Sequence, residues 1–331
     1  MKQLGKTKLM VHEVGLGGIP IQRINAGQVS DIIDAMILQK MNFIDTARAY
    51  SNSEALIGEA IKGRREHFVL ASKSMAKTYE AMKRDVDISL ANLQTDVIDL
   101  YQLHNPKATD DISGPYHALE EAKAIGKIRH IGITNHSAPF LLQVMKQYQF
   151  DTIQFPYNFL EAQGEEVFRV AHEAGLGTIA MKPLAGGVIQ RGYLAIKFIQ
   201  NNSNITLAIP GMASVEEVLE NSHIKEPTYS SEELAYMQEL RATTDKAFCH
   251  RCGYCLPCTK GIEIPVMFTF EGYFNRYDLK NWARDRYQSM AVKADACIAC
   301  GVCETRCPYH LHIIEKMKQV ANIFQEGERQ S

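Results

Sequence analysis

The organisation of the chain is clearest in the segment Asn42-Phe43-Ile44-Asp45-Thr46-Ala47-Arg48-Ala49-Tyr50-Ser51-Asn52-Ser53-Glu54. Phe43 and Ile44 indicate a short buried strand, and Ser53 is the expected N-cap of a following helix. Asp45 and Tyr50 then lie just past the carboxyl end of the strand, where parallel α/β barrels place catalytic groups. Taken alone, Asp45 could cap a turn and Tyr50 could be a packing residue. Other parts of the sequence are needed to decide between these structural roles and a catalytic one.

The same strand-then-helix order repeats along the first 240 residues. After a short strand at Thr7–Met10, eight largely apolar runs predict strands buried on both faces, as in parallel sheets. They lie at Val14–Leu16, Phe43–Ile44, Phe68–Ala71, Val97–Leu103, Ile128–Ile133, Thr152–Phe155, Gly177–Met181 and Ile205–Ile209. Eight such units favour an α/β fold of the (β/α)8, or TIM, barrel type. A doubly wound sheet is the alternative, but it rarely needs eight evenly spaced units.

Polar residues end five of these predicted strands: Asp45, Lys73, His104, Asn135 and Lys182. In a barrel the carboxyl ends of the strands converge on one mouth. A solvated lysine or a histidine bonded to backbone would explain any one of these residues, but it does not explain their common position. The pattern therefore predicts an active site at the mouth.

The composition narrows the class of protein. The chain has 331 residues, 46% hydrophobic content and a net charge of −2, so general attraction to nucleic acid or to anionic membranes is not expected. No apolar run is long enough to span a bilayer, and the amino-terminal residues lack the apolar core of a secretory signal. These features predict a soluble, cytoplasmic protein that binds neither nucleic acid nor membranes.

All eight cysteines lie between Cys249 and Cys307. This change in composition predicts a boundary near residues 242–248, with one domain over residues 1–241 and a second over residues 242–331. In the cytosol, clustered thiols indicate metal or redox chemistry more often than disulfides.

The cysteines form two runs. The first has the spacing C-x2-C-x2-C-x2-C, and the second, followed by Pro308, has the C-x2-C-x2-C-x3-C-P spacing of bacterial ferredoxins that bind a 4Fe–4S cluster. Zinc sites prefer separated C-x2-C pairs and are the weaker alternative. A purely structural role for the clusters stays open. The runs comprise Cys249, Cys252, Cys255 and Cys258, and Cys297, Cys300, Cys303 and Cys307.

Eight thiols suit two 4Fe–4S clusters. In two-cluster ferredoxins the fourth cysteine of each run binds the cluster of the other run. By that rule Cys307 completes the cluster of the first run, and Cys258 completes that of the second. Helical segments are expected at Pro265–Tyr273, Leu279–Tyr287 and His312–Phe324, so the second domain should be small and mainly helical.

Together these motifs resemble the aldo-keto reductase family, in a subgroup with a carboxyl-terminal dicluster domain. The resemblance rests on Asp45 and Tyr50 in their segment, on Lys73 in Leu70-Ala71-Ser72-Lys73, and on His104 in Asp99-Leu100-Tyr101-Gln102-Leu103-His104. It implies an oxidoreductase that interconverts a carbonyl and an alcohol. Tyr50 would be the general acid and base, with Lys73 lowering its pKa, Asp45 holding Lys73, and His104 orienting the carbonyl oxygen.

The resemblance also implies NAD(H) or NADP(H) as cofactor. Asn135, in Ile131-Gly132-Ile133-Thr134-Asn135, and Gln154 would hold the nicotinamide carboxamide. Met181, Lys182 and Pro183 would line the nicotinamide, and Gly211, Ser214 and Asn221 would lie near the adenosine phosphate.

Two departures from the family pattern matter for the cofactor. Met181-Lys182 stands where many members have a tyrosine and a serine, so a soft thioether replaces the aromatic stacking platform. The segment after the last strand, residues 211–217, holds no cation and includes Glu216 and Glu217. NADH is therefore expected to bind at least as well as NADPH.

Three functions are compatible with these observations. The first is a carbonyl reductase whose clusters relay electrons to or from a ferredoxin or another redox protein. The second is an ordinary carbonyl reductase with structural clusters. The third is an electron-transfer or sensor module on a barrel without turnover, which the complete set of Asp45, Tyr50, Lys73 and His104 argues against.

Overall fold

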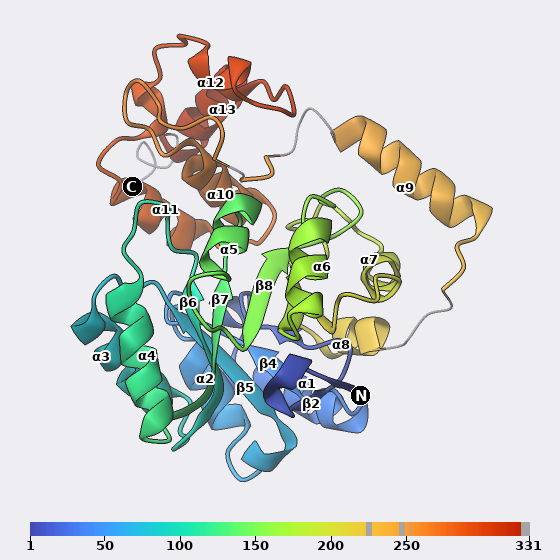
Figure 1. The fold of residues 1–331 in the computed structure, drawn as a ribbon. Helices are drawn as coiled ribbons and strands as arrows, with labels where there is room; N and C mark the ends of the chain where they lie inside the picture. The colour runs from blue at the N-terminus through green and yellow to red at the C-terminus, as the bar shows by residue number, and fades with distance from the viewer. Residues whose placement is uncertain (223–226, 245–248, 252, 326–331) are drawn as a thin grey trace. The chain divides into compact units, whose positions relative to one another are not determined.

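Eight parallel strands form one sheet in the part of the chain that the structure describes, and a helix follows each strand. Each strand pairs with the next in sequence. Bridges from Val14 to Ala208 and from Gly17 to Gly211 join the first strand to the last, so the sheet closes into a barrel (Figure 1). The predicted (β/α)8 fold is confirmed. Its strands are β3 (Leu16–Gly17), β4 (Phe43–Asp45), β5 (Val69–Ser74), β6 (Ile98–His104), β7 (Ile128–Thr134), β8 (Thr152–Pro156), β9 (Gly177–Met181) and β10 (Leu207–Ile209).

The helices of the barrel begin at recognisable caps. Asn25 and Gln28 form a capping box at the first helix, and Thr78 and Ser137 accept hydrogen bonds from backbone N–H groups at the starts of the third and fifth. The helices surround the strands (Figure 1). They are α1 (Ala26–Leu38), α2 (Ser53–Ala60), α3 (Tyr79–Asn92), α4 (Ser113–Ala124), α5 (Ala138–Val144), α6 (Glu165–Glu173), α7 (Gly192–Gln200) and α8 (Val215–Ser222).

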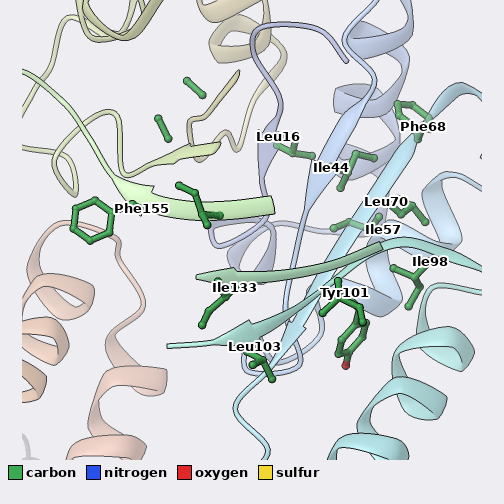
Figure 2. Close-up of a cluster of buried hydrophobic side chains, with 14 of the residues drawn as sticks. Leu16, Ile44, Ile57, Phe68, Leu70, Ile98, Tyr101, Leu103, Ile133 and Phe155 are labelled. Atoms are coloured by element: carbon green, nitrogen blue, oxygen red, sulfur yellow. The ribbon is translucent and has the colours of Figure 1, made fainter. Parts of the chain in front are cut away.

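Alternate residues of β4, β5, β6, β9 and β10 belong to two separate buried clusters. The larger cluster, between strands and helices, includes Ile44, Leu70, Tyr101, Leu103, Ile133 and Phe155, which Figure 2 shows on their strands. The smaller cluster fills the barrel interior and includes Phe43, Ala71, Leu100, Ile179 and Met181. This alternation follows from the two-residue period of a strand. It places Asp45, Lys73, Gln102 and His104 on the interior side.

A short antiparallel pair, β1 (Lys2–Gln3) and β2 (Met10–Val11), precedes the barrel. The strand predicted at Thr7–Met10 is wrong over most of its length, because residues Gly5–Thr7 form a 3-10 turn and Lys8 has a φ of 64°. Leu4 belongs to the interior cluster and packs against Gly177 at the start of β9. The pair therefore covers the amino-terminal end of the barrel, opposite the mouth.

The structure is a computed structural model and describes residues 1–222, 227–244, 249–251 and 253–325. The chain divides into two units, Met1–Tyr229 and Ser230–Ser331. The second unit is mainly helical, as predicted, although α9 was not expected from the sequence. Its core includes Met267, Phe268, Tyr287, Val320 and Phe324. Its helices are α9 (Ser231–Thr244), α10 (Ile264–Asn275), α11 (Lys280–Gln288), α12 (Val302–Thr305) and α13 (Ile313–Gln325).

Among the described residues, the structure contains no helix that is both long and apolar enough to span a membrane.

Candidate active site and thiol cavities

Asp45 and Lys73 form a buried ion pair at the carboxyl ends of β4 and β5. Lys73 Nζ donates a 2.5 Å hydrogen bond to Asp45 Oδ2 and another, of 2.8 Å, to the backbone oxygen of Thr46. Only 1% of Lys73 and 2% of Asp45 is exposed to solvent. The barrel thus holds a cation at a fixed position just inside its mouth.

Tyr50 and His104 lie next to this pair. Lys73 Nζ is 4.9 Å from the centre of the Tyr50 ring. The rings of Tyr50 and His104 meet edge to face, with centres 5.8 Å apart and planes at 89°. Both rings are partly exposed, unlike Asp45 and Lys73. The structure therefore brings all four predicted catalytic residues together, with the phenol and the imidazole on the accessible side.

Burial controls the charges at the site. It raises the pKa of the Asp45 carboxyl and lowers the pKa of the Lys73 ammonium, and the attraction between the two groups opposes both shifts. Burial and the nearby cations Lys73 and Lys182 hold the pKa of His104 well below its usual value. His104 is therefore a neutral imidazole near pH 7. Its Nδ1 is buried with no hydrogen-bond partner in the described part of the chain, which leaves Nε2 to reach a bound molecule.

A buried polar network holds the loop that carries Tyr50. The Arg48 N–H donates to the backbone oxygen of Lys73 (3.0 Å), and its guanidinium donates to Glu54 (2.7 Å). Glu54 is 1% exposed and also accepts hydrogen bonds from Ser72 (2.6 Å) and Ser89 (2.7 Å). Sequence reasoning missed this network, because a charged pair six residues apart carries no distinctive motif.

The predicted capping role of Ser53 is wrong. Asn52 is the N-cap of α2, and Ser53 is the first helical residue. The Ser53 hydroxyl instead donates to the backbone oxygen of Gly18 (2.9 Å) and shares a 2.9 Å hydrogen bond with Thr46. The serine therefore ties the start of α2 to the loops at the barrel mouth.

Gln154 lies in the barrel interior. Gln102, a residue to which sequence reasoning gave no role, connects it to Asp45. Gln102 Nε2 donates to Asp45 Oδ1 (3.2 Å) and to Gln154 Oε1 (3.1 Å). Because Gln102 precedes His104 by two residues on β6, strand periodicity places it on the same interior face and could have identified it.

Asn135 follows β7, but its side chain is largely engaged with neighbouring backbone. Its Oδ1 accepts hydrogen bonds from the N–H groups of His136 (2.9 Å) and Ser137 (2.8 Å), and its Nδ2 donates to the oxygen of Pro106 (2.8 Å). An amide nitrogen carries two hydrogens, so one donor remains for a ligand. Asn135 thus joins two loops at the mouth.

Of the predicted nicotinamide-lining residues, Met181 is the last residue of β9, and Lys182 and Pro183 follow it. Met181 is 8% exposed, and its sulfur lies 3.5 Å from Thr134 Oγ1 and 3.8 Å from Gln154 Nε2. Lys182 adopts a left-handed backbone with φ of 55°, and its oxygen accepts a 2.9 Å hydrogen bond from Asn158. Pro183 is buried.

Of the residues predicted near the adenosine phosphate, Gly211 and Ser214 lie between β10 and α8, and Asn221 lies on α8. Gly211 packs against Pro20, because a Cβ at this glycine would lie 2.8 Å from Pro20 Cγ. Ser214 Oγ accepts a 3.3 Å hydrogen bond from the N–H of Glu217, whose carboxylate accepts a 2.5 Å hydrogen bond from the N–H of Ala213. Asn221 Nδ2 donates to the oxygen of Glu217 (2.8 Å). The start of α8 is therefore already occupied by a carboxylate.

This arrangement agrees with comparisons to known proteins. The family model described as the aldo/keto reductase family matches residues 13–194. The chain belongs to the aldo/keto reductase family. It is an oxidoreductase, and the family model covers most of the strands and helices that build its barrel.

Two relatives and a solved structure illustrate the similarity of this reductase to other family members. An uncharacterized oxidoreductase of Bacillus subtilis, YqkF, is 29% identical over 226 residues, which are 60% of this chain and 73% of YqkF. The aldo-keto reductase YhdN of the same organism is 34% identical over 174 residues, covering 48% of this chain and 53% of YhdN. The holo form of aldo-keto reductase AKR11C1 from Bacillus halodurans has a TM-score of 0.64 and 26% identity, covering 72% and 95% of the two chains.

The second unit of the reductase matches a model described as a 4Fe-4S dicluster domain over residues 248–312. Two cavities in its described residues bring cysteines of both runs together. The first thiol cavity is lined by Cys249 and Cys255 of the first run and Cys307 of the second. The second thiol cavity is lined by Cys258 of the first run and Cys297, Cys300 and Cys303 of the second. Cys252 lies outside the described residues.

Further contacts connect the two cysteine runs. The rings of His250 and Tyr309 stack beside the first thiol cavity, with centres 3.8 Å apart. Arg306 donates a 3.1 Å hydrogen bond to the oxygen of Pro257, and Thr259 Oγ1 lies 3.4 Å from Cys300 Sγ. The fourth cysteine of each run therefore lies with the other run. Thiolates are the usual ligands of 4Fe–4S clusters, so the side chains are of the right chemical type, although among the described residues no three of them are arranged to hold a metal ion.

Proposed function

We propose that this reductase interconverts a carbonyl compound and an alcohol with NAD(H) or NADP(H), and that Tyr50 is its general acid and base. The observation that supports this most strongly is the position of Lys73, between the Asp45 carboxylate and the Tyr50 ring. A phenol near its ordinary pKa of ~10 is a poor proton donor at pH 7. A cation held beside it stabilises the phenolate and so makes the proton easier to donate.

Each residue of the site then has a defined task in carbonyl reduction. The reduced nicotinamide, when bound, supplies hydride to the carbonyl carbon. Tyr50 donates its hydroxyl proton to the carbonyl oxygen, and Lys73 stabilises the phenolate that is left. Asp45 keeps the ammonium charged and in place. Neutral His104 donates a hydrogen bond to the same oxygen and so orients the substrate. In alcohol oxidation the same residues act in reverse, with Tyr50 accepting the proton.

The chain also offers groups that fit a nicotinamide. Gln154 Nε2, whose contact to the Met181 sulfur is weak, would donate to the carboxamide oxygen. The remaining hydrogen of Asn135 Nδ2 would contribute a second hydrogen bond. Met181 supplies an apolar surface for the ring, and Lys182 and Pro183 complete this side. The adenosine half would lie along residues 211–221.

We infer that the eight cysteines hold two 4Fe–4S clusters with exchanged fourth ligands. The support is the sorting of the seven described cysteines, since each thiol cavity combines thiols of one run with the last thiol of the other. When bound, such clusters transfer single electrons. Their role would be to pass electrons to or from a partner such as a ferredoxin. The alternative, a stabilising role, is favoured by the packing of cysteines on the apolar core of the second unit.

A single anaerobic experiment separates the two roles. The protein is purified without oxygen, its iron, sulfide and flavin are measured, and NADH or an alcohol substrate is then added while cluster absorbance is followed. Bleaching by NADH or by the alcohol supports electron relay. Unchanged clusters during steady oxidation of NADH by a carbonyl compound support the stabilising role. Absence of substrate-dependent NADH oxidation with any aldehyde or ketone would contradict the proposed reductase activity.

A further inference from the structure

A buried polar layer crosses the barrel just inside its mouth. TIM barrels fill their interior with layers of side chains from alternate strands, mostly bulky and apolar. Here β4, β6 and β8 contribute Asp45, Gln102 and Gln154, which are 2%, 0% and 1% exposed. Polar groups this deeply buried are costly unless their hydrogen bonds are satisfied. Their presence therefore calls for a function beyond packing.

The hydrogen bonds of this layer have a definite direction. Asp45 pairs with Lys73 and its carboxylate accepts, so the Gln102 amide must turn its nitrogen toward Asp45. The same nitrogen donates to Gln154 Oε1, so Gln154 Nε2 is the donor end of the second amide, and this side chain also hydrogen-bonds the Asp45 carboxylate. That nitrogen lies 3.8 Å from the Met181 sulfur, a weak acceptor. The charge on Asp45 thus fixes the orientation of Gln154 both directly and through Gln102.

The neighbouring strand is adapted to this side chain. Gln102 pairs in register with Gly132 of β7. A Cβ at Gly132 would lie 3.0 Å from Gln102 Cγ and 2.3 Å from Thr152 Oγ1. Glycine is therefore required here mainly by Thr152, and it also leaves room for the Gln102 side chain. Gln102 Oε1 is also buried without a hydrogen-bond partner among the described residues. A leucine would fill the same space without that cost, so packing alone does not explain the glutamine.

We propose that Gln102 is a positioning residue that presents the Gln154 amide nitrogen to the carboxamide oxygen of the nicotinamide. This proposal rests on the proposed function, in which Gln154 binds that carboxamide. Gln102 itself makes no contact with the cofactor. It acts by holding Gln154 as a donor, and it links the nicotinamide position to the Asp45–Lys73 pair that supports Tyr50.

The test compares two ligands on the full-length protein with its clusters oxidised. NAD⁺ carries the nicotinamide, whereas ADP-ribose lacks it, and calorimetry gives the affinity for each. Gln102→Met keeps the length of the side chain but removes the donor. It should weaken NAD⁺ binding roughly threefold to tenfold, the effect of about one hydrogen bond, and leave ADP-ribose binding unchanged. Gln102→Leu serves as a second variant if the methionine variant fails to fold.

A double-mutant cycle completes the test. Because Gln102 acts through Gln154, the variant Gln102→Met/Gln154→Leu should bind NAD⁺ no more weakly than Gln154→Leu alone. Equal weakening of NAD⁺ and ADP-ribose by Gln102→Met, or additive losses in the cycle, would overturn the proposal. If Gln154→Leu weakens NAD⁺ but Gln102→Met does not, this inference fails while the proposed function stands. If Gln154→Leu has no effect on NAD⁺, the assigned nicotinamide site fails, and this inference fails with it.

Discussion

Lys73 and Asp45 form a 2.5 Å hydrogen-bonded ion pair in the barrel interior, where neither residue is more than 2% exposed. Burying two charges costs desolvation free energy that their attraction offsets only while both are present. Stability alone therefore does not account for the pair, since apolar side chains could fill the same volume without the desolvation cost. Its contact with the Tyr50 ring suggests why the fold keeps it.

We expect removal of one partner of this pair to destabilise the protein more than removal of both. Lys73→Met leaves the Asp45 charge buried and unpaired, which should lower the free energy of barrel unfolding by about 3–5 kcal/mol. The double variant Asp45→Leu/Lys73→Met should recover most of that stability but no turnover. Urea unfolding followed by circular dichroism and a carbonyl reduction assay measure the two effects. A single variant as stable as the double variant would contradict the role of the pair.

The cofactor preference should follow the carboxylates at the start of α8. Glu216 is charged at neutral pH, since backbone and Ser214 hydrogen bonds lower its pKa, and Glu217 already accepts from Ala213 N–H. NADH should therefore bind at least as tightly as NADPH. Glu216→Lys should strengthen NADPH binding by about tenfold, as expected for a charge reversal near a phosphate at the surface. Fluorescence titration of both cofactors measures this.

A matched control for that variant is Glu66→Lys. Glu66 lies before β5, at the end of the barrel opposite the mouth, so it changes the net charge equally but far from the cofactor segment. A clear preference of the unmodified protein for NADPH, or equal effects of the two variants, would show that residues 211–217 do not hold the adenosine phosphate.

The main features of the fold followed from local patterns, and the errors have physical causes. The eight strands were predictable because each is a short apolar run, and Asp45, Lys73 and His104 were predictable because they end such runs. Ser53 was misplaced as a cap because its hydroxyl binds Gly18, a residue that only the tertiary fold brings near. The helix at Ser231–Thr244 was missed because the apolar residues of that segment do not gather on one helical face. The Arg48–Glu54 network depends on contacts from two other elements, β5 and α3, which no local pattern records.

If the cysteine runs exchange their fourth ligands, substitution of the last cysteine of one run should alter the cluster held by the other run. The unmodified protein should contain about eight irons per chain. Cys258→Ser, although in the first run, should alter the same electron paramagnetic resonance signal as Cys300→Ser, because both thiols line the second thiol cavity. Cys255→Ser is the matched control from the first run and lines the first thiol cavity. If Cys258→Ser instead reproduces the spectrum of Cys255→Ser, the fourth ligands are not exchanged.

His104 should make the protein less stable in mild acid. The native state holds its pKa well below the usual value through burial and the cations Lys73 and Lys182. The unfolded chain takes up a proton near pH 6.5 that the native state excludes, so lowering the pH favours unfolding. The loss attributable to His104 is at most about 1.4 kcal/mol per pH unit below ~6.5. His104→Gln should show a shallower decline in unfolding free energy between pH 7 and pH 5. An identical decline would mean that His104 titrates normally in the native state.

The most direct test of the account is the turnover of Tyr50→Phe, measured without oxygen as NADH oxidation by a carbonyl compound that the unmodified protein reduces. The variant lacks only the hydroxyl proposed as the proton donor, so turnover should fall roughly 10²–10⁴-fold while the dissociation constant for NADH stays nearly unchanged. Tyr79→Phe, which removes a hydroxyl bonded to Glu121 on the outer helices, should retain full activity. Turnover by Tyr50→Phe equal to that of the unmodified protein would contradict the assignment of Tyr50 as the general acid.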